Sequence, residues 1–308
     1  MKAQLIALLE GILRVSSRQL YKWRQSINTE VSQEVGHTDR TFSVVITTHS
    51  RRFFSGALPL LKTLRSSEAF RNVAIYVVVN ADTFGSYDFS LRSRFLEQAC
   101  ALGNVFPVSL GEPAGMSELW NTGIRAAGTK HVLVLSDDLT ILDEGLPELR
   151  RKVSQSLEHT PLCVINKSWG HFAISQDAID KVGWFEDRLL GFGHEDGDYT
   201  HRFRKVYETE PLDIQVFGVN NVSSKVGFEE IVKGTGKYSL FNDVMISQKY
   251  GPTSQQGFGV FGKLNESTQE HPGNASWEFK QKFKHLLNEA DPEQISIELE
   301  RYFNQTGK

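Results

Sequence analysis

Three short apolar runs, rich in β-branched residues, constrain the fold most strongly. They are Phe42–Thr47, Val73–Val79 and His131–Leu135. Continuous runs of this length are typical of parallel strands that are buried on both faces of a sheet. The intervening segments have helical patterns and cover Leu58–Ser66, Leu91–Leu102 and Ser117–Ala127. This alternation predicts an α/β fold, with a Rossmann-like, mostly parallel sheet, right-handed crossovers and helices on both sides.

The composition narrows the class of protein further. The chain has 308 residues, of which 40% are apolar and 23% charged. These values are typical of a globular protein of about two domains and exclude a wholly disordered or collagen-like chain. The net charge of −3 provides no basic field for nucleic acid, so no nucleic-acid partner is predicted. No uncharged apolar run reaches roughly 18 residues, so the sequence predicts no transmembrane helix.

Two cysteines, Cys100 and Cys163, each stand inside an apolar segment. We expect both to be reduced residues of the core. Two such residues do not form a disulfide framework or a zinc site, and they fit a reducing compartment.

Residues 2–25 have the pattern of one amphipathic helix. Five basic side chains and one acid give residues 1–24 a net charge of +4. An apolar face opposite a basic stripe is compatible with peripheral contact with an anionic membrane. The alternative is that this helix packs on its own domain or on a second copy in a homodimer. The predicted location is cytoplasmic, or peripheral on the inner face of the membrane.

The chain divides into three predicted regions. Residues 1–40 hold the amphipathic helix and a polar linker, residues 41–255 form the α/β domain, and residues 256–308 form a helical extension. Within the extension, Asp291, Pro292 and Gln294 are typical of a helix start, with Asp291 as the cap.

Ligands of such sheets bind beyond the carboxyl ends of the parallel strands. The first strand is followed by Thr47-Thr48-His49-Ser50-Arg51. Hydroxyl groups there can hydrogen-bond a ligand, and Arg51 can bind an anionic one. The same residues are also typical of ordinary loop capping, and the sequence leaves both interpretations open.

Ser136-Asp137-Asp138 follows the buried strand His131–Leu135 directly. Two adjacent carboxylates repel one another unless a cation offsets their charge. Oxygen ligands suit Mg²⁺ or Mn²⁺, which complete their coordination with phosphates and water. The buried strand favours a metal site over the alternative, a turn in which one Asp caps a helix.

A third candidate site, and the second acidic segment, runs from Gly191 to Tyr199 and contains Glu195, Asp196 and Asp198. Glycines allow the backbone to approach a ligand closely. Clustered carboxylates raise one another's pKa, as a general base requires. A solvated acidic loop is the alternative. A glycosidase pair is disfavoured, because adjacent carboxylates rarely straddle a glycosidic bond at the required separation.

The order of these motifs resembles that of GT-A fold glycosyltransferases. The order is TTHSR after the first strand, NAD after the second, GMSELWNTGIRAAG, SDD and then GWFEDRLLGFGHEDGDYTHRF. The chain is most similar to the inverting family 2 group. The stretch from Phe172 also resembles the carboxyl-terminal galactosyltransferase motif with its Gly-x-Glu-Asp pattern. The resemblance covers about Thr41–Gly251.

The resemblance implies a role for each matching residue. Asp138 is the implied ligand of Mn²⁺ or Mg²⁺, and Asp196 is the implied catalytic base, with Glu195 beside it. The implied donor-binding residues are Thr47, His49, Arg51, Asn80, Asp82, Asn121, Gly123 and Asp137. The implied acceptor-binding residues are Trp184, Phe192 and His194.

Two departures from the family pattern leave parts of the site open. The position that often carries a base-reading Asp is Val79, so the nucleotide is not fixed and UDP is only favoured. No histidine lies between His201 and His271, where many relatives carry a further metal ligand.

The sequence therefore predicts a metal-dependent, inverting hexosyltransferase. It would move a sugar from a nucleotide-sugar to a hydroxyl of a glycan or lipid-linked acceptor in polysaccharide biosynthesis. The alternative is a nucleotide- or sugar-binding protein of the same fold that has lost catalysis. No Gly-x-Gly-x-x-Gly motif follows a strand, which disfavours a dinucleotide-dependent oxidoreductase.

Overall fold

The computed structural model describes residues 39–81 and 88–221, with the single positions 242, 245, 246, 249, 250, 294, 297, 298 and 301. The amphipathic helix predicted for residues 2–25 lies outside the described residues, as do Asp82 and most of the carboxyl-terminal extension. Positions 294, 297, 298 and 301 of that extension are helical.

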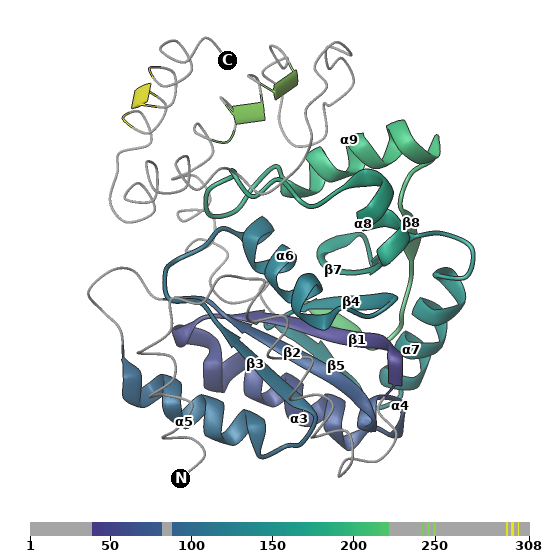
Figure 1. Cartoon of the computed structure of the whole chain (residues 1–308). Coiled ribbons are helices and arrows are strands. Elements are labelled where there is room, and N and C mark those ends of the chain that lie inside the picture. Colours follow the sequence, from purple (N-terminus) through teal and green to yellow (C-terminus); the bar gives the residue numbers. More distant parts are fainter. Residues whose placement is uncertain are drawn as a thin grey trace.

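A seven-stranded sheet forms the centre of the described part (Figure 1). Its spatial order is β3-β2-β1-β4-β7-β6-β8, and all neighbours are parallel except at β7, which runs antiparallel to β4 and β6. The strands are β1 (Asp39–Thr48), β2 (Val73–Val79), β3 (Val105–Ser109), β4 (His131–Ser136), β6 (Leu162–Ile165), β7 (Ser168–Ser175) and β8 (Leu212–Ile214). A two-stranded ribbon pairs β5 (Leu139–Ile141) with β9 (Val219–Asn221).

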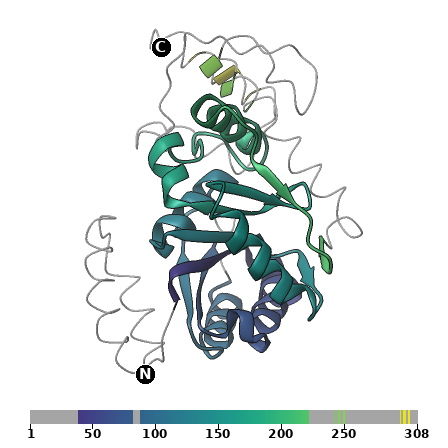
Figure 2. The same ribbon diagram turned by 90° about the vertical axis from the view of Figure 1, so that its right-hand side faces the viewer.

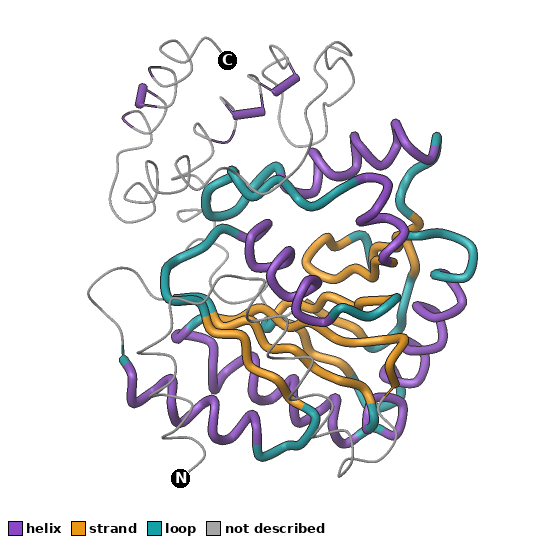
Figure 3. The backbone as a smooth tube through the Cα atoms, viewed as in Figure 1, coloured by secondary structure: helices purple, strands orange, loops and turns teal. Residues whose placement is uncertain are grey.

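Helices cover both faces of the sheet (Figures 2 and 3). One face packs against α3 (Leu58–Ser66), α4 (Glu68–Arg71), α5 (Phe89–Cys100) and α7 (Gly145–Ser156). The other packs against α6 (Met116–Ala127), α8 (Gln176–Val182) and α9 (Glu195–Tyr207). Every residue of β2 is buried, because this strand has apolar neighbours on both faces.

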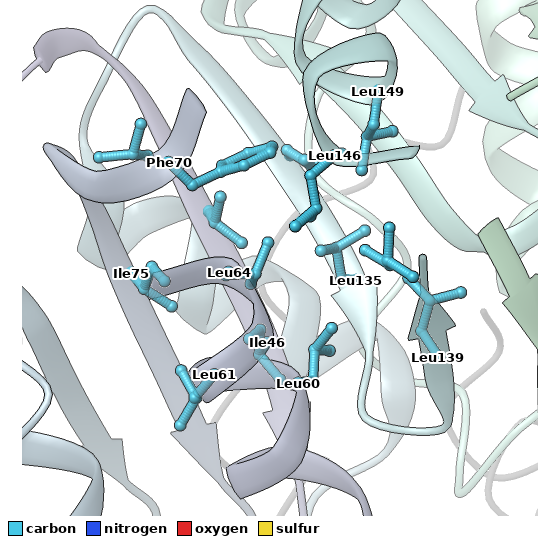
Figure 4. Packing of buried hydrophobic residues seen from close by; sticks show 14 of the residues in the cluster. Ile46, Leu60, Leu61, Leu64, Phe70, Ile75, Leu135, Leu139, Leu146 and Leu149 are labelled. Carbon is cyan, nitrogen blue, oxygen red and sulfur yellow. The ribbon is translucent and has the colours of Figure 1, made fainter. Parts of the chain in front are cut away.

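The first of these two cores joins α3 to the sheet and to α7 (Figure 4). Leu60, Leu61 and Leu64 of α3 are almost completely buried. They extend the apolar surface of Ile46 in β1, and the same cluster includes Leu149 of α7. Close packing of this kind fixes the strand ends and the loops that follow them.

Helix starts and ends follow local signals. The side chain of Asp88 accepts a hydrogen bond from the Leu91 N–H and caps α5, and Ser175 caps α8 by accepting from the Ala178 N–H. Gly128 ends α6 in the left-handed conformation, with φ of 58°. Between β1 and α3 lie a short 3₁₀ turn, η1 (Ser50–Arg52), and a π-helical turn, η2 (Phe53–Ala57).

The mostly parallel α/β sheet with flanking helices, as the GT-A resemblance implies, is confirmed. One expectation is wrong: Cys100 is exposed, whereas Cys163 is buried in the core. Helix α5 buries Arg92, Phe95 and Ala99, so Cys100 falls on its outer side. Within the described ranges, no helix has both the length and the apolar content to span a bilayer. The predicted domain boundaries stay predictions.

Gly123 allows α6 to lie close to the sheet. A Cβ atom at this position would lie 2.3 Å from Val45 Cγ1 and 3.0 Å from Val78 Cγ2. We expect Gly123→Ala to lower the free energy of unfolding by roughly 1–3 kcal/mol through overpacking. A gain of about 1 kcal/mol in helix propensity offsets part of this loss. Urea unfolding measures it, with Gly111→Ala as control, because no atom lies within 4 Å of a Cβ at Gly111. Equal stability of the two variants would contradict the close approach.

Candidate functional site

Predicted site residues follow three neighbouring parallel strands. Because β2, β1 and β4 are adjacent and parallel, their carboxyl ends meet at one edge of the sheet. Thr47 is buried at the end of β1, Asn80 follows β2, and Asp137 follows β4. The sheet therefore brings together residues that lie far apart in the sequence, as the strand pattern predicted.

The acid pair Asp137–Asp138 is held by an arginine that the sequence analysis did not single out. Arg52 Nη1 lies 3.1 Å from Asp137 Oδ1 and 3.3 Å from Asp138 Oδ2. The Ser136 hydroxyl donates a hydrogen bond to Asp138 Oδ1. The neighbouring Arg51, which was predicted to bind the donor, is exposed, and His49 is half-buried.

Asp137 is only 4% exposed, and its Oδ2 atom is buried without a hydrogen-bond partner. Burial raises the pKa of Asp137 to about 6, against the lowering effects of Thr48 and Arg52. A buried, unpartnered carboxylate oxygen costs free energy unless a ligand satisfies it. The oxygen atoms of this pair therefore fit a hard divalent cation such as Mg²⁺ or Mn²⁺.

His171 on β7 is a further group that sequence reasoning missed. It pairs with Leu135 of β4, is almost fully buried, and has no hydrogen-bond partner at either ring nitrogen. Burial lowers the pKa of His171, and the charge of Asp138 opposes that effect. Among the described residues, however, no three His, Cys, Asp or Glu side chains form a metal-binding group.

The second acidic segment begins in a loop with left-handed backbone conformations. Gly193 has φ of 124° and His194 has φ of 73°. Glu195, the first residue of α9, is buried and accepts a hydrogen bond from the Gly193 N–H at 2.6 Å. Burial, reinforced by the charge of Asp196, raises the pKa of Glu195 to about 8. Asp196 is half-buried and accepts from the Gly197 N–H at 2.7 Å.

Backbone contacts tie this acidic segment to the carboxyl edge of the sheet. The Asn80 side chain bonds the backbone N–H and carbonyl of Ala114, each at 3.0 Å. Two residues further on, the Met116 N–H donates to the Gly191 carbonyl at 2.7 Å. The segment 114–116 thus links the end of β2 to the loop that precedes Glu195.

Asp198, the third acid of the segment, belongs to a buried ionic network. Lys249 Nζ lies 2.6 Å from Asp198 Oδ1 and 3.0 Å from Glu186 Oε2. Arg202 Nη2 lies 2.7 Å from Asp198 Oδ2. Burial alone would raise the pKa of Asp198, but the charges of Arg202 and Lys249 hold it far below its usual value. Asp198 therefore stays ionised and holds α9 in place.

Asn242 secures the same loop from another part of the chain. Its side-chain amide accepts from the Leu190 N–H at 2.9 Å and donates to the carbonyls of Leu190 and Gly193.

Other predicted residues have internal contacts. The Asn121 side chain bonds the backbone N–H and carbonyl of Phe185, which joins α6 to the segment before α9. Gly123 faces the sheet, as described above. A donor-binding role for either residue stays a prediction.

Of the predicted acceptor residues, Phe192 and His194 stand in the loop before Glu195, whereas Trp184 packs against Arg125 in the last turn of α6. The Arg125 guanidinium lies over the Trp184 ring, 4.7 Å from the ring centroid. Phe192 is 42% exposed, and His194 is half-buried. Both flank Gly193, so exposed apolar surface adjoins the acids.

No protein-family model and no curated protein sequence matches the chain. Among solved structures, a glucosyl-3-phosphoglycerate synthase from Mycobacterium tuberculosis, in complex with Mn²⁺, UDP and glucosyl-3-phosphoglycerate, is 14% identical. The match covers 76% of this chain and 90% of that chain, with a TM-score of 0.47. A mannosyltransferase from Pyrobaculum calidifontis, in complex with GDP-mannose and Mn²⁺, is 15% identical. That match covers 74% of this chain and 71% of the other, with a TM-score of 0.44. Likenesses of this size carry no conclusion about the activity of this chain.

The raised pKa of Glu195 predicts a pH dependence of stability. An unfolded glutamate titrates near 4.5, so between about pH 4.5 and 8 the folded state binds more protons than the unfolded state. The contribution of Glu195 to the free energy of unfolding therefore falls as the pH rises through this window. Glu195→Gln removes the titration, so its stability relative to the wild type should rise with pH, by up to about 1.4 kcal/mol per unit.

Urea unfolding at about pH 5 and about pH 8 measures this difference. The exposed Glu158→Gln is the matched control. A stability difference between Glu195→Gln and wild type that stays constant over this range would contradict the buried, protonated state of Glu195.

Proposed function

We propose that this protein is a divalent-metal-dependent glycosyltransferase that uses a nucleotide-sugar donor, with UDP-sugars favoured. The observation that carries the proposal is the pairing of two different acidic sites at one edge of the sheet. One, Asp137–Asp138, has a buried oxygen without a partner. The other places Asp196 at the start of α9, where it stays accessible from solvent.

The donor side of the proposed site uses the loops after β1, β2 and β4. Thr47, His49 and Arg51 would contact the nucleotide, together with Asn80 and Asp82. Asp138 would hold Mn²⁺ or Mg²⁺, and Asp137 would face the ribose or the sugar. When bound, the metal supplies positive charge that stabilises the departing diphosphate.

The chain's own residues prepare that donor site. The Ser136 hydroxyl orients Asp138, and the packing of β4 fixes the direction of both carboxylates. Holding the reacting groups in one geometry supplies a large share of the acceleration in such transfers.

On the acceptor side, we assign the role of general base to Asp196. A half-buried carboxylate can reach an acceptor hydroxyl and take its proton as the oxygen attacks. Glu195 differs, because it is buried, holds its proton at neutral pH and binds the Gly193 N–H. We therefore propose that Glu195 positions the loop that precedes α9 and thereby the base at the start of that helix. A single base opposite the leaving group implies inversion at the anomeric carbon.

The acceptor is proposed to be a hydroxyl of a glycan or of a lipid-linked saccharide. Trp184 and Phe192 would offer apolar ring surfaces to a sugar, with His194 beside them. The basic segment of residues 2–25 would place the enzyme on the inner face of an anionic membrane, where polysaccharide precursors are assembled.

A binding protein without catalysis is the second candidate. It would need the acid pair and its metal but not the accessible Asp196. The presence of an accessible Asp196 beside the buried Glu195, whose pKa is raised, favours the enzyme, because strongly perturbed carboxylates are typical of functional sites.

Asp196→Asn should lower turnover by about 10²–10⁴-fold, because it removes the base. Its affinity for nucleoside diphosphate with Mn²⁺ should equal that of the wild type. Turnover is measured as release of UDP or GDP from the corresponding hexose donors, and affinity by calorimetry.

Asp180→Asn is the control, since Asp180 lies on the exposed surface of α8, where it accepts a hydrogen bond from the Gln176 side chain. Wild-type turnover in Asp196→Asn would remove this residue from catalysis. Nucleotide binding without turnover in the wild type would favour the binding protein.

A further inference from the structure

Arg52 occupies the position between the two carboxylates that a divalent cation would need. A single nitrogen, Nη1, lies within 3.3 Å of oxygens from both Asp137 and Asp138. An arginine guanidinium stays protonated in proteins, so Arg52 brings a full positive charge to the two carboxylates. In the described structure, Arg52 is therefore the counter-ion of the acid pair.

The backbone that carries Arg52 is fixed. Phe53, the next residue, stacks on Phe95 with ring centroids 4.4 Å apart and an interplanar angle of 8°. A Cβ atom at Gly56 would lie only 2.3 Å from the Asp137 carbonyl oxygen. The turn η2 can approach the acid pair so closely only because residue 56 is glycine.

The side chain, in contrast, has room to move. Arg52 is 26% exposed, whereas the side chain of Asp137 is 6% exposed. A change of side-chain rotamer would release the carboxylates without moving the packed backbone. A guanidinium also binds phosphate oxygens through paired hydrogen bonds, so a nucleoside diphosphate offers it a new partner.

A divalent cation and Arg52 compete for the same oxygens. Two positive groups within about 4 Å of one another repel strongly in a partly buried site. The cation must therefore displace Arg52, and displacement is easier when a diphosphate receives the guanidinium.

We infer that Arg52 is a resident counter-ion that blocks the metal site until a nucleoside diphosphate binds, and so makes metal binding depend on the nucleotide. The inference rests on the proposed function and adds one statement to it, namely that the metal and the nucleotide-sugar donor bind together. By linkage, the factor by which nucleotide tightens metal binding equals the factor by which metal tightens nucleotide binding.

The test measures free Mn²⁺ by electron paramagnetic resonance in titrations of the full chain, without nucleotide and with UDP or GDP. The experiments are run at about pH 8, well above the ordinary pKa of a carboxylate. Arg52→Ala should bind Mn²⁺ without nucleotide about tenfold more tightly than the wild type. The enhancement by nucleotide should shrink by at least the same factor, because the variant also lacks the guanidinium that the diphosphate would bind.

Arg52→Gln provides a second variant that keeps part of the side-chain bulk and the hydrogen bonding but removes the charge. Arg52→Lys keeps the charge, so its Mn²⁺ binding without nucleotide should stay as weak as that of the wild type. Arg71→Ala is the charge-matched control, because Arg71 forms an exposed pair with Glu68 on α4. Asp138→Asn should abolish Mn²⁺ binding in every condition.

One result would overturn the role of Arg52 but leave the proposed metal site standing. In this result the wild type shows nucleotide-enhanced Mn²⁺ binding, while Arg52→Ala and Arg52→Gln, without nucleotide, both bind Mn²⁺ no more tightly than the wild type. Failure of the wild type to bind Mn²⁺ with either nucleotide would overturn the inference together with the proposed metal site.

Discussion

Repulsion between two adjacent carboxylates at the end of a buried strand is the constraint on which the site depends. Strand β4 is central and apolar, so Asp137 enters a poorly solvated position as soon as the strand ends. Strand β1 is the parallel neighbour of β4, and the turn after it brings Arg52 to the acids. Gly56 removes the side chain that would keep this turn away. The order of strands thus supplies the charge that the acid pair requires.

Three acids within four residues of α9 have three different environments. Glu195 is buried beside backbone N–H groups and keeps its proton. Asp198 is fully buried but paired with Arg202 and Lys249, so it is ionised and structural. Asp196 alone is open enough to meet a substrate. Removing Lys249 would leave two buried carboxylates short of positive charge, an arrangement that is usually strongly destabilising. The network therefore positions Asp196 by fixing the first turns of its helix.

The sequence was sufficient to predict the sheet because buried parallel strands are continuous apolar runs with few other interpretations. The predicted segment Leu58–Ser66 coincides with α3, and Val73–Val79 coincides with β2. The antiparallel direction of β7 has no such signature, because pairing direction depends on connections in space. The exposure of Cys100 was not predicted either. Cys100 follows the buried Ala99 by one residue and so lies outside the buried face of α5.

Within the site, residue types were easier to predict than partners. The acids at 137, 138, 195 and 196 follow from local motifs. The choice between Arg51 and Arg52 does not, since adjacent side chains of a 3₁₀ turn point in different directions and only the fold decides which one meets Asp137. Contacts across long stretches of sequence, such as that of Lys249 with Asp198, likewise leave no local pattern.

The most direct test of the account is the thermal unfolding midpoint with UDP, GDP, CMP or dTDP, each with and without Mn²⁺. A ligand that binds only the folded state stabilises it by about 2.7 kcal/mol at a hundredfold excess over its dissociation constant. The account predicts a rise in the midpoint with at least one nucleotide, and only when Mn²⁺ is present. A rise of the same size without Mn²⁺, or no rise with any of the four nucleotides, would contradict a metal-dependent nucleotide site at Asp137–Asp138.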